Sequence, residues 1–322
     1  MPVDSRQMSG AANTIPPSDD RERSFSARSA AIGTRVGRRL ARRLLYFGIT
    51  LFLGSFAAAM LVRIAPGFDA DVAQLDTRLS QESVDALRAK RAANSDIFRY
   101  YAQFVRSAVH GDFGTSINLQ RPVRELLKER WPTTARLAGL GLLGGWLLAC
   151  LLAFSAALFR QTLPLCGVVA ALLSGLFLCI PTAVLALAFV IWRAPASIAV
   201  ALVVFPKVFR YARNVLLRNY ESAHIITALA KGIGPLRVLF FHVLPVSAAP
   251  LVALAGVSVT IALGATIPVE ALLGIPGIGD LAWQAALNRD LPLLVTVTGM
   301  VTIVTLGANL ISDMLNADVV GS

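Results

Sequence analysis

Charged residues are scarce in this sequence of 322 residues. They make up 15% of it, whereas soluble globular domains usually carry about 25%. Hydrophobic residues account for 56%, and the mean hydropathy is +0.65. This balance excludes an ordinary soluble domain and indicates an integral membrane protein. The net charge of +11 is then no sign of nucleic-acid binding, although a nucleic-acid arm within residues 1–43 stays open as an alternative.

Cysteine and histidine are also rare, with three residues of each type. The cysteines all lie inside apolar stretches, at Cys150, Cys166 and Cys179. An odd number of cysteines in such places favours small apolar packing residues over a disulfide framework. No metal-ligand spacing joins the histidines, which are His110, His224 and His242. We therefore predict no metal site.

Nucleotide-binding motifs are missing as well. The phosphate-loop pattern G-x-x-x-x-G-K-[ST] occurs nowhere, so the chain cannot cradle ATP in that manner. Intramembrane ionisable residues, which a proton-coupled carrier normally needs, are almost absent apart from Lys207 and Arg210. We predict that the chain is not an enzyme and binds no cofactor. Any ATP and Mg would belong to partner subunits.

What the sequence has instead is long charge-free stretches, which predict an all-α polytopic membrane fold with about six transmembrane helices. Titratable residues directly bound four of these spans, at 44–62, 137–159, 243–269 and 291–312, with His242 before the third. A further span from about 164 to 192 is expected to be one helix kinked at Pro181. The remaining span, 195–217, is only consistent with a membrane if its basic residues lie at the cytoplasmic end.

Basic residues indicate the orientation of the chain. Six of them crowd before the first span, at Arg28, Arg35, Arg38, Arg39, Arg42 and Arg43. By the positive-inside rule the N-terminus is cytoplasmic. Residues 1–34 are predicted to be a disordered cytoplasmic tail, and 35–316 the transmembrane domain.

Within that domain, 63–136 would be an external segment with a small helical part between the first and second spans. Residues 121–132 would form an amphipathic interfacial helix. Residues 207–245 would form a cytoplasmic loop, and 317–322 a C-terminal tail.

The most informative part of that loop reads ESAHIITALAKGIGPLRVLFFHVLP, from Glu221 to Pro245. Two helix-compatible runs, 224–230 and 236–244, flank an interruption made by Gly232, Gly234 and Pro235. We expect two short helices that meet at a bend and that a soluble partner could bind. The alternative is a solvated basic loop that only fixes the topology.

This loop resembles the cytoplasmic loop of ABC-importer permeases, whose pattern is roughly E-A-A-x3-G-x9-I-x-L-P. Ala228 and Gly232 hold two of its positions and Pro245 closes it, while Ile226 and His242 depart from it. The variant is similar to the dipeptide/oligopeptide/nickel branch. Two other stretches agree, namely GDFGTS at 111–116 followed by RPV, and EALLGIPGIG at 270–279 followed by R-D-x-P.

The resemblance covers about residues 40 to 316. It implies a permease subunit of an ATP-driven importer in the bacterial inner membrane, forming half of the pathway for peptides or, less favoured, nickel chelates or other small solutes. Implied partners are a second homologous permease, two cytoplasmic ATPases and an extracytoplasmic binding protein. The residues implied for coupling to the ATPase are Ala228, Ala230, Lys231, Gly232, Gly234, Pro235, Arg237, His242 and Pro245.

A second candidate site lies around Glu270, at the outer end of the predicted fifth span. Glu270, Pro276, Gly277 and Gly279 would line an outer gate or contact the binding protein. The preferred interpretation is local, with Glu270 capping a backbone or pairing with Arg289. His242 is similarly interpreted first as a structural residue of the membrane edge.

Two alternatives to the importer class remain at this stage, an ATP-independent carrier or channel and a membrane scaffold. One departure from the family pattern also stands out, because only residues 193–195 separate the predicted third and fourth spans, where the family has a longer external loop. The cargo and the nature of the permease pairing, homodimeric or heterodimeric, are not encoded in these patterns.

Overall fold

The computed structural model describes Arg42 and residues 45–54, 56–57, 60, 103–108, 110–159 and 164–321. The chain divides into two units, residues 1–50 and 51–322. In the first unit the described residues are helical, and Arg42 Nε donates a 3.1 Å hydrogen bond to the Tyr46 hydroxyl. The elements discussed below belong to the second unit.

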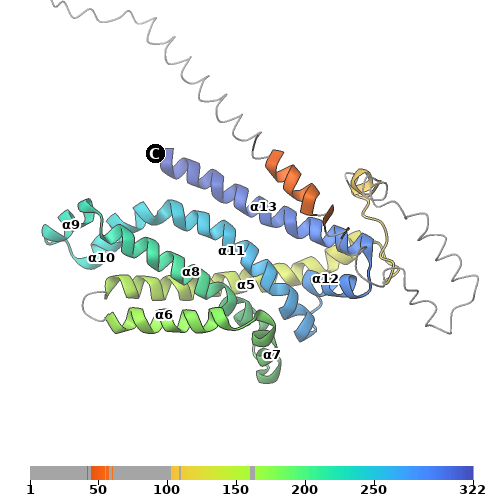
Figure 1. The fold of residues 1–322 in the computed structure, drawn as a ribbon, viewed down its shortest axis with the longest axis horizontal. Helices are drawn as coiled ribbons and strands as arrows, with labels where there is room; N and C mark the ends of the chain where they lie inside the picture. The colour runs from red at the N-terminus through yellow and green to blue at the C-terminus, as the bar shows by residue number, and fades with distance from the viewer. Residues whose placement is uncertain are drawn as a thin grey trace, which may run out of the picture. The chain divides into compact units, whose positions relative to one another are not determined.

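The described part of the second unit is helical, with an isolated bridge between Thr115 and Pro122 as its one β-type pairing (Figure 1). Its main helices are α5 (Val123–Leu158), α6 (Pro164–Cys179), α7 (Thr182–Trp192), α8 (Ala196–Tyr220), α9 (Ala223–Ala230), α10 (Pro235–Val238), η1 (Leu239–Val243), α11 (Leu244–Leu273), α12 (Ile278–Leu287) and α13 (Leu291–Gly321). The predicted all-α membrane fold is confirmed.

Long apolar helices carry this fold. Among the described residues, Val123–Leu158, Pro235–Leu273 and Leu291–Asn316 are each long and apolar enough to cross a bilayer. α13 continues through residues 317–321 of the predicted tail. Leu45–Gly54 is a shorter apolar helix. The remainder of the predicted first span and most of the predicted external segment lie outside the described residues.

The prediction that residues 164–192 form one helix kinked at Pro181 is wrong. α6 and α7 are separate helices that meet at a bend of 96°. Pro181 is the N-cap of α7 with a ψ of 139°, an extended conformation that takes the chain out of the helix. A proline has no N–H to continue the helical ladder, and here the result is a break rather than a kink.

The predicted helix at 121–132 is present from Val123 onward, but it is the first part of a longer helix. α5 runs without interruption from Val123, with Pro132 inside it, and thus takes in residues 123–136 of the predicted external segment. Val123, Leu126 and Leu127 are buried in a second hydrophobic cluster with residues of α12 and α13. Burying this first part of α5 holds it in line with the apolar part that follows.

α5 and α8 form the most extensive helix pair and run parallel. Gly141 lies against Val200 and Gly145 against Val204, so positions four residues apart on one helix meet positions four apart on the other. Small residues let helices approach closely inside a membrane, where lipid removes the hydrophobic drive for packing.

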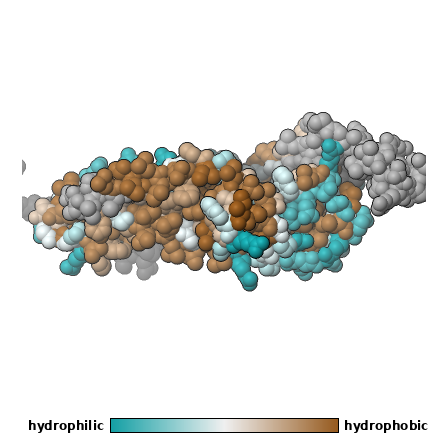
Figure 2. Space-filling model, turned by 90° about the horizontal axis from the view of Figure 1, so that it is seen from below, coloured by the Kyte–Doolittle hydropathy of each residue, from teal (hydrophilic) through white to brown (hydrophobic). Residues whose placement is uncertain are grey.

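The two ends of the long helices differ in what they carry. α9 and α10 lie at one end, and α12 lies at the other beside the starts of α5 and α13 (Figure 1). On the face seen in Figure 2, hydrophobic residues cover the middle and hydrophilic ones gather toward the end with α12.

Candidate functional site

α9 ends in a left-handed turn at Gly232, which has a φ of +77°. The Gly232 N–H donates to the Leu229 carbonyl at 2.9 Å, and the Ile233 N–H donates to the Ala228 carbonyl at 3.3 Å. These two bonds form a Schellman motif, which satisfies the last carbonyls of the helix. The predicted interruption at Gly232 is confirmed, and its cause is a backbone conformation that glycine adopts without strain.

The second half of the loop is not a separate short helix, so that part of the prediction is wrong. α10 passes through the π-helical turn η1 directly into α11, giving one long helix over Pro235–Leu273. Pro235 stands at the first position of this helix, where its missing N–H costs nothing. Pro245 follows the π turn, which accommodates another residue without an N–H.

The predicted coupling residues divide by their burial. Those exposed at the surface are Ala230, Lys231, Gly232, Gly234, Pro235, Arg237 and Pro245. Ala228 is only 6% exposed and joins the main hydrophobic core together with Ile225. The small side chain of Ala228 therefore serves the packing of α9 on its own chain. His242 is half-buried, and its Nδ1 has no hydrogen-bond partner within the described part of the chain.

An apolar and cationic surface remains on the outside of this loop. Ile226 and Leu236 are 55% and 56% exposed. Lys231 and Arg237 are exposed close to them in sequence. Together these four residues form what we name the loop surface, which offers both hydrophobic area and positive charge to a soluble partner.

At the opposite end, Glu270 caps the N-terminus of α12. Its Oε2 accepts hydrogen bonds from the Gly279 N–H at 2.6 Å and the Asp280 N–H at 3.3 Å. Its Oε1 accepts one from the Thr134 hydroxyl at 2.7 Å, and Thr134 Oγ1 accepts the Ile278 N–H at 2.7 Å. A carboxylate at a helix N-terminus is favoured both by these unpaired N–H groups and by the helix dipole.

Glu270 is fully buried, which agrees with the preferred local interpretation. Its donors are a hydroxyl and two backbone amides, and no ion pair joins it to Arg289 among the described residues. A role in an outer gate or in binding-protein contact stays a prediction. In this structure such a contact would have to be made by exposed neighbours such as Pro276.

Gly277 and Gly279 are buried against this carboxylate. A Cβ at Gly277 would collide with the Glu270 carboxyl group, and one at Gly279 would lie 2.7 Å from the Ile267 Cα. Both glycines thus let the start of α12 approach α11 closely. The glycines of this stretch allow the backbone of α12 to lie close to α11, and they do not form a flexible hinge.

A second buried carboxylate, that of Asp290, joins two motifs that are far apart in the sequence. We call the hydrogen-bond sets of Glu270 and Asp290 the two clamps. Ser116 Oγ donates a 2.5 Å hydrogen bond to Asp290 Oδ2, and the Asn118 N–H donates to the same oxygen at 3.1 Å. Asp290 Oδ1 accepts the Leu293 N–H at 3.2 Å, which caps α13. Asp290 and Ser116 are both 1% exposed or less. Sequence reasoning quoted both motifs but did not predict that they meet.

Replacing Ser116 with alanine is expected to destabilise this end by about 1.5–3 kcal/mol, because a buried carboxylate loses a hydrogen-bond donor. The Leu119 N–H also loses its acceptor, Ser116 Oγ, at 3.0 Å. The measurement is the thermal unfolding midpoint of the detergent-solubilised protein. Ser155→Ala is the control, since that hydroxyl only bonds to Leu152 of its own helix. Equal midpoints for the two variants would contradict the clamp.

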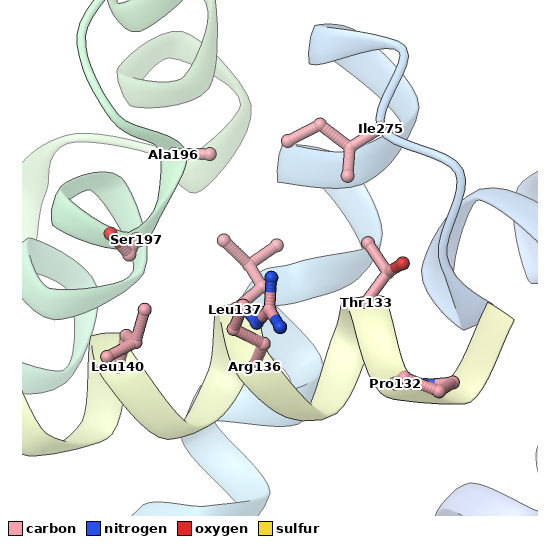
Figure 3. Close-up of a pocket in the computed structure, with 8 residues that line it drawn as sticks. All are labelled: Pro132, Thr133, Arg136, Leu137, Leu140, Ala196, Ser197 and Ile275. Carbon is pink, nitrogen blue, oxygen red and sulfur yellow. The ribbon is translucent and has the colours of Figure 1, made fainter.

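An open pocket of about 350 Å³ lies between α5, the start of α8 and the turn after α11 (Figure 3). Leu137, Leu140 and Ile275 give it apolar walls, and Arg136 points its guanidinium into it. α7 and α8 are joined by three residues only, in agreement with the predicted short connection. Arg193 in this turn has a φ of 51°, an unusual conformation for a side chain of its size.

The described residues contain no group of three or more His, Cys, Asp or Glu side chains that could hold a metal ion. At the start of α5, a 2.6 Å contact with Glu129 raises the pKa of the exposed Arg121 guanidinium. This is an ordinary surface ion pair.

Long apolar helices packed through glycines, with an exposed basic loop at one end, define a polytopic membrane protein. Residues 141–319 match the family of binding-protein-dependent transport system inner membrane components. The chain belongs to this family and is therefore the membrane permease component of such a system.

Curated relatives agree in length and type. The oligopeptide transport system permease protein OppB of Salmonella typhimurium is 27% identical over 273 residues, covering 78% of this chain and 88% of the relative. The oligopeptide transport system permease protein AppB of Bacillus subtilis is 26% identical, with 84% and 94% covered. The dipeptide transport system permease protein DppB of Lactococcus lactis subsp. cremoris is 23% identical, with 84% and 93% covered.

Proposed function

We propose that this chain forms half of the translocation pathway of an ATP-driven importer for peptides. It would pair with a second homologous permease, two ATPases on the cytoplasmic side and an extracytoplasmic binding protein. The peptide cargo is supported by the names of the relatives, which are oligopeptide and dipeptide permeases. ATP and Mg would be bound by the ATPases, and hydrolysis would occur there.

The observation that carries this proposal is the loop surface beside the Schellman turn at Gly232. α9 buries Ile225 and Ala228 against its own chain and leaves Ile226 exposed. If closure of the ATPases moves α9, the movement would be transmitted to α8 and to the long helix that follows, because the loop packs on both helices. The N-terminus and α9 would both lie in the cytoplasm, as the basic residues suggest.

The first test concerns the turn itself. Replacing Gly232 with valine should reduce ATPase recovery with the tagged permease by about tenfold, because a β-branched residue at positive φ adds about 1–3 kcal/mol of strain. An added Cβ meets no atom within 4 Å there, so the effect would be one of backbone conformation. Recovery is measured by detergent purification from the native membrane and mass spectrometry of the partners.

Matched variants isolate the cause. Gly232→Asn should retain association, since asparagine tolerates the left-handed conformation. Gly234→Ala should also retain it, because Gly234 has a φ of −60° and open space around its Cβ position. Ile226→Asp should lose association without any change of backbone. If Gly232→Val and Ile226→Asp both bind the ATPase normally, α9 is not the coupling element.

Recovery of the chain without an ATPase, together with uptake in ATP-free vesicles, would instead favour the carrier alternative.

A further inference from the structure

The second half of α8 exposes a face made only of polar residues. We name it the α8 polar face; its members are Lys207, Arg210, Tyr211, Asn214 and Arg218. Their spacing of i, i+3, i+4, i+7 and i+11 places them on one side of the helix. The buried residues on the rest of α8 from Lys207 onward are apolar or aromatic, namely Val208, Phe209, Ala212, Leu216 and Tyr220.

The packing of α8 on α5 fixes the depth of this face. Val204 lies beside Gly145 and the two helices run parallel, so Lys207 is level with Leu148. Leu148 is the midpoint of the charge-free stretch 137–159 of α5. Further along, Ala156 and Arg213 both approach Gly167 on α6, which confirms the register.

Lys207 therefore lies about 16 Å from either end of that stretch, at 1.5 Å per helical residue. Arg210 is only about 4.5 Å closer to the α9 end. Both are too deep for their side chains to extend freely into the water outside a bilayer. Charged residues at such depth face a water-filled cavity or a protein partner rather than lipid, because lipid cannot solvate them.

No acidic side chain neutralises these cations within the described residues. Lys207, Arg210 and Arg218 form no ion pair there. The neighbouring helices expose the opposite kind of surface at similar depth, with Leu151 on α5 and Leu172 on α6 each more than 60% exposed. The exposed leucines can contact lipid chains favourably, whereas the α8 polar face cannot.

We propose that the α8 polar face lines the water-filled part of the pathway and that its cations attract the carboxylate groups of the cargo. This inference rests on the proposed function and deepens it. The favoured solutes carry a carboxylate, as the C-terminus of a short peptide does. An uncompensated row of like charges in a narrow cavity raises the local concentration of anions.

The test uses single cysteines in a background where Cys150, Cys166 and Cys179 are replaced by alanine. Asn214→Cys and Tyr211→Cys are treated with membrane-impermeant thiosulfonates in inside-out vesicles that contain the assembled complex. Leu151→Cys is the control, since it lies level with Arg210 on another exposed surface. We expect Asn214→Cys to react at least about tenfold faster than the control.

Charge is tested with an anionic and a cationic thiosulfonate of the same size. The anionic reagent should react about tenfold faster at Asn214→Cys, within the range that focused fields produce. Adding Lys207→Gln or Arg210→Gln should reduce this preference by several fold, and high salt should do the same. Lys128→Gln, at an exposed position near the start of α5, should leave it unchanged.

Failures of the inference and of the proposed function are distinguishable. If the ATPase is recovered but Asn214→Cys reacts no faster than Leu151→Cys, the face is covered by a partner or lipid and the inference is overturned. If the two reagents react equally and Lys207→Gln has no effect, the attraction of carboxylates is overturned. If no ATPase is recovered, the proposed function fails and this inference fails with it.

Discussion

Replacing Glu270 with leucine is expected to release the start of α12 and to lower the stability of the folded permease by about 3 kcal/mol or more. The Gly279 and Asp280 N–H groups and the Thr134 hydroxyl would all lose their acceptor in a buried place. A buried donor left unpaired costs about 1–3 kcal/mol, and bonds to charged groups are the stronger ones. Thermal unfolding in detergent measures the loss, and faster proteolysis between α11 and α12 locates it.

Two variants separate charge from shape. Glu270→Gln retains one oxygen acceptor and should cost about half as much as leucine, since the amide must turn its NH₂ toward a donor or toward Thr134. Glu125→Gln is the control, because the Glu125 side chain is 60% exposed. If Glu270→Leu unfolds at the temperature of the unmodified chain, the capping role of Glu270 is wrong.

A side chain at Gly141 is expected to separate α5 from α8. An added Cβ would lie 2.5 Å from the Val200 Cβ and 3.2 Å from the Ser197 carbonyl oxygen. The first contact is impossible without movement of one helix, and the second is with backbone that cannot rotate away. Gly141→Ala should cost about 1–3 kcal/mol, in the range of overpacked interiors, and Gly141→Leu should prevent recovery of folded protein. Size-exclusion profiles after heating measure both.

The chain offers a matched control and a compensating change. Gly139→Ala adds the same methyl group to the same helix where nothing lies within 4 Å, so stability should be unchanged or slightly higher. Val200→Gly combined with Gly141→Ala should recover part of the loss, because the methyl group then has space. Additive effects of the two changes would mean that they do not share the contact.

The two ends of the molecule are held together in different ways. The Glu270 and Asp290 clamps use charged groups in fully buried positions, and each satisfies the first N–H groups of a helix. The loop surface at the other end is held by a Schellman turn and leaves its apolar side chains open. One end of the molecule is thus held by buried hydrogen bonds, and the other exposes apolar side chains.

Much of this architecture could be read from local sequence. The long charge-free stretches predicted membrane helices, and Gly232, Gly234 and Pro235 predicted the interruption after α9. The predictions that failed were also local ones. Pro181 was expected to kink a helix and instead broke it, while the helix predicted at 121–132 continues past Pro132 as part of α5. A proline removes one N–H in both cases, and the surrounding packing decides whether the helix continues.

The sequence by itself determined an all-α membrane fold, because hydropathy and the spacing of glycine and proline act within a few residues of each other. The permease class followed from the resemblance of residues 221–245 to the loop of importer permeases. Only the tertiary structure decided the partners of its buried polar groups. Thr134 and Glu270 are 136 residues apart, and Ser116 and Asp290 are 174 apart. No periodicity specifies such pairs. Likewise, the position of Lys207 level with Leu148 followed from the contact of Val204 with Gly145, since the register of two helices depends on how they pack.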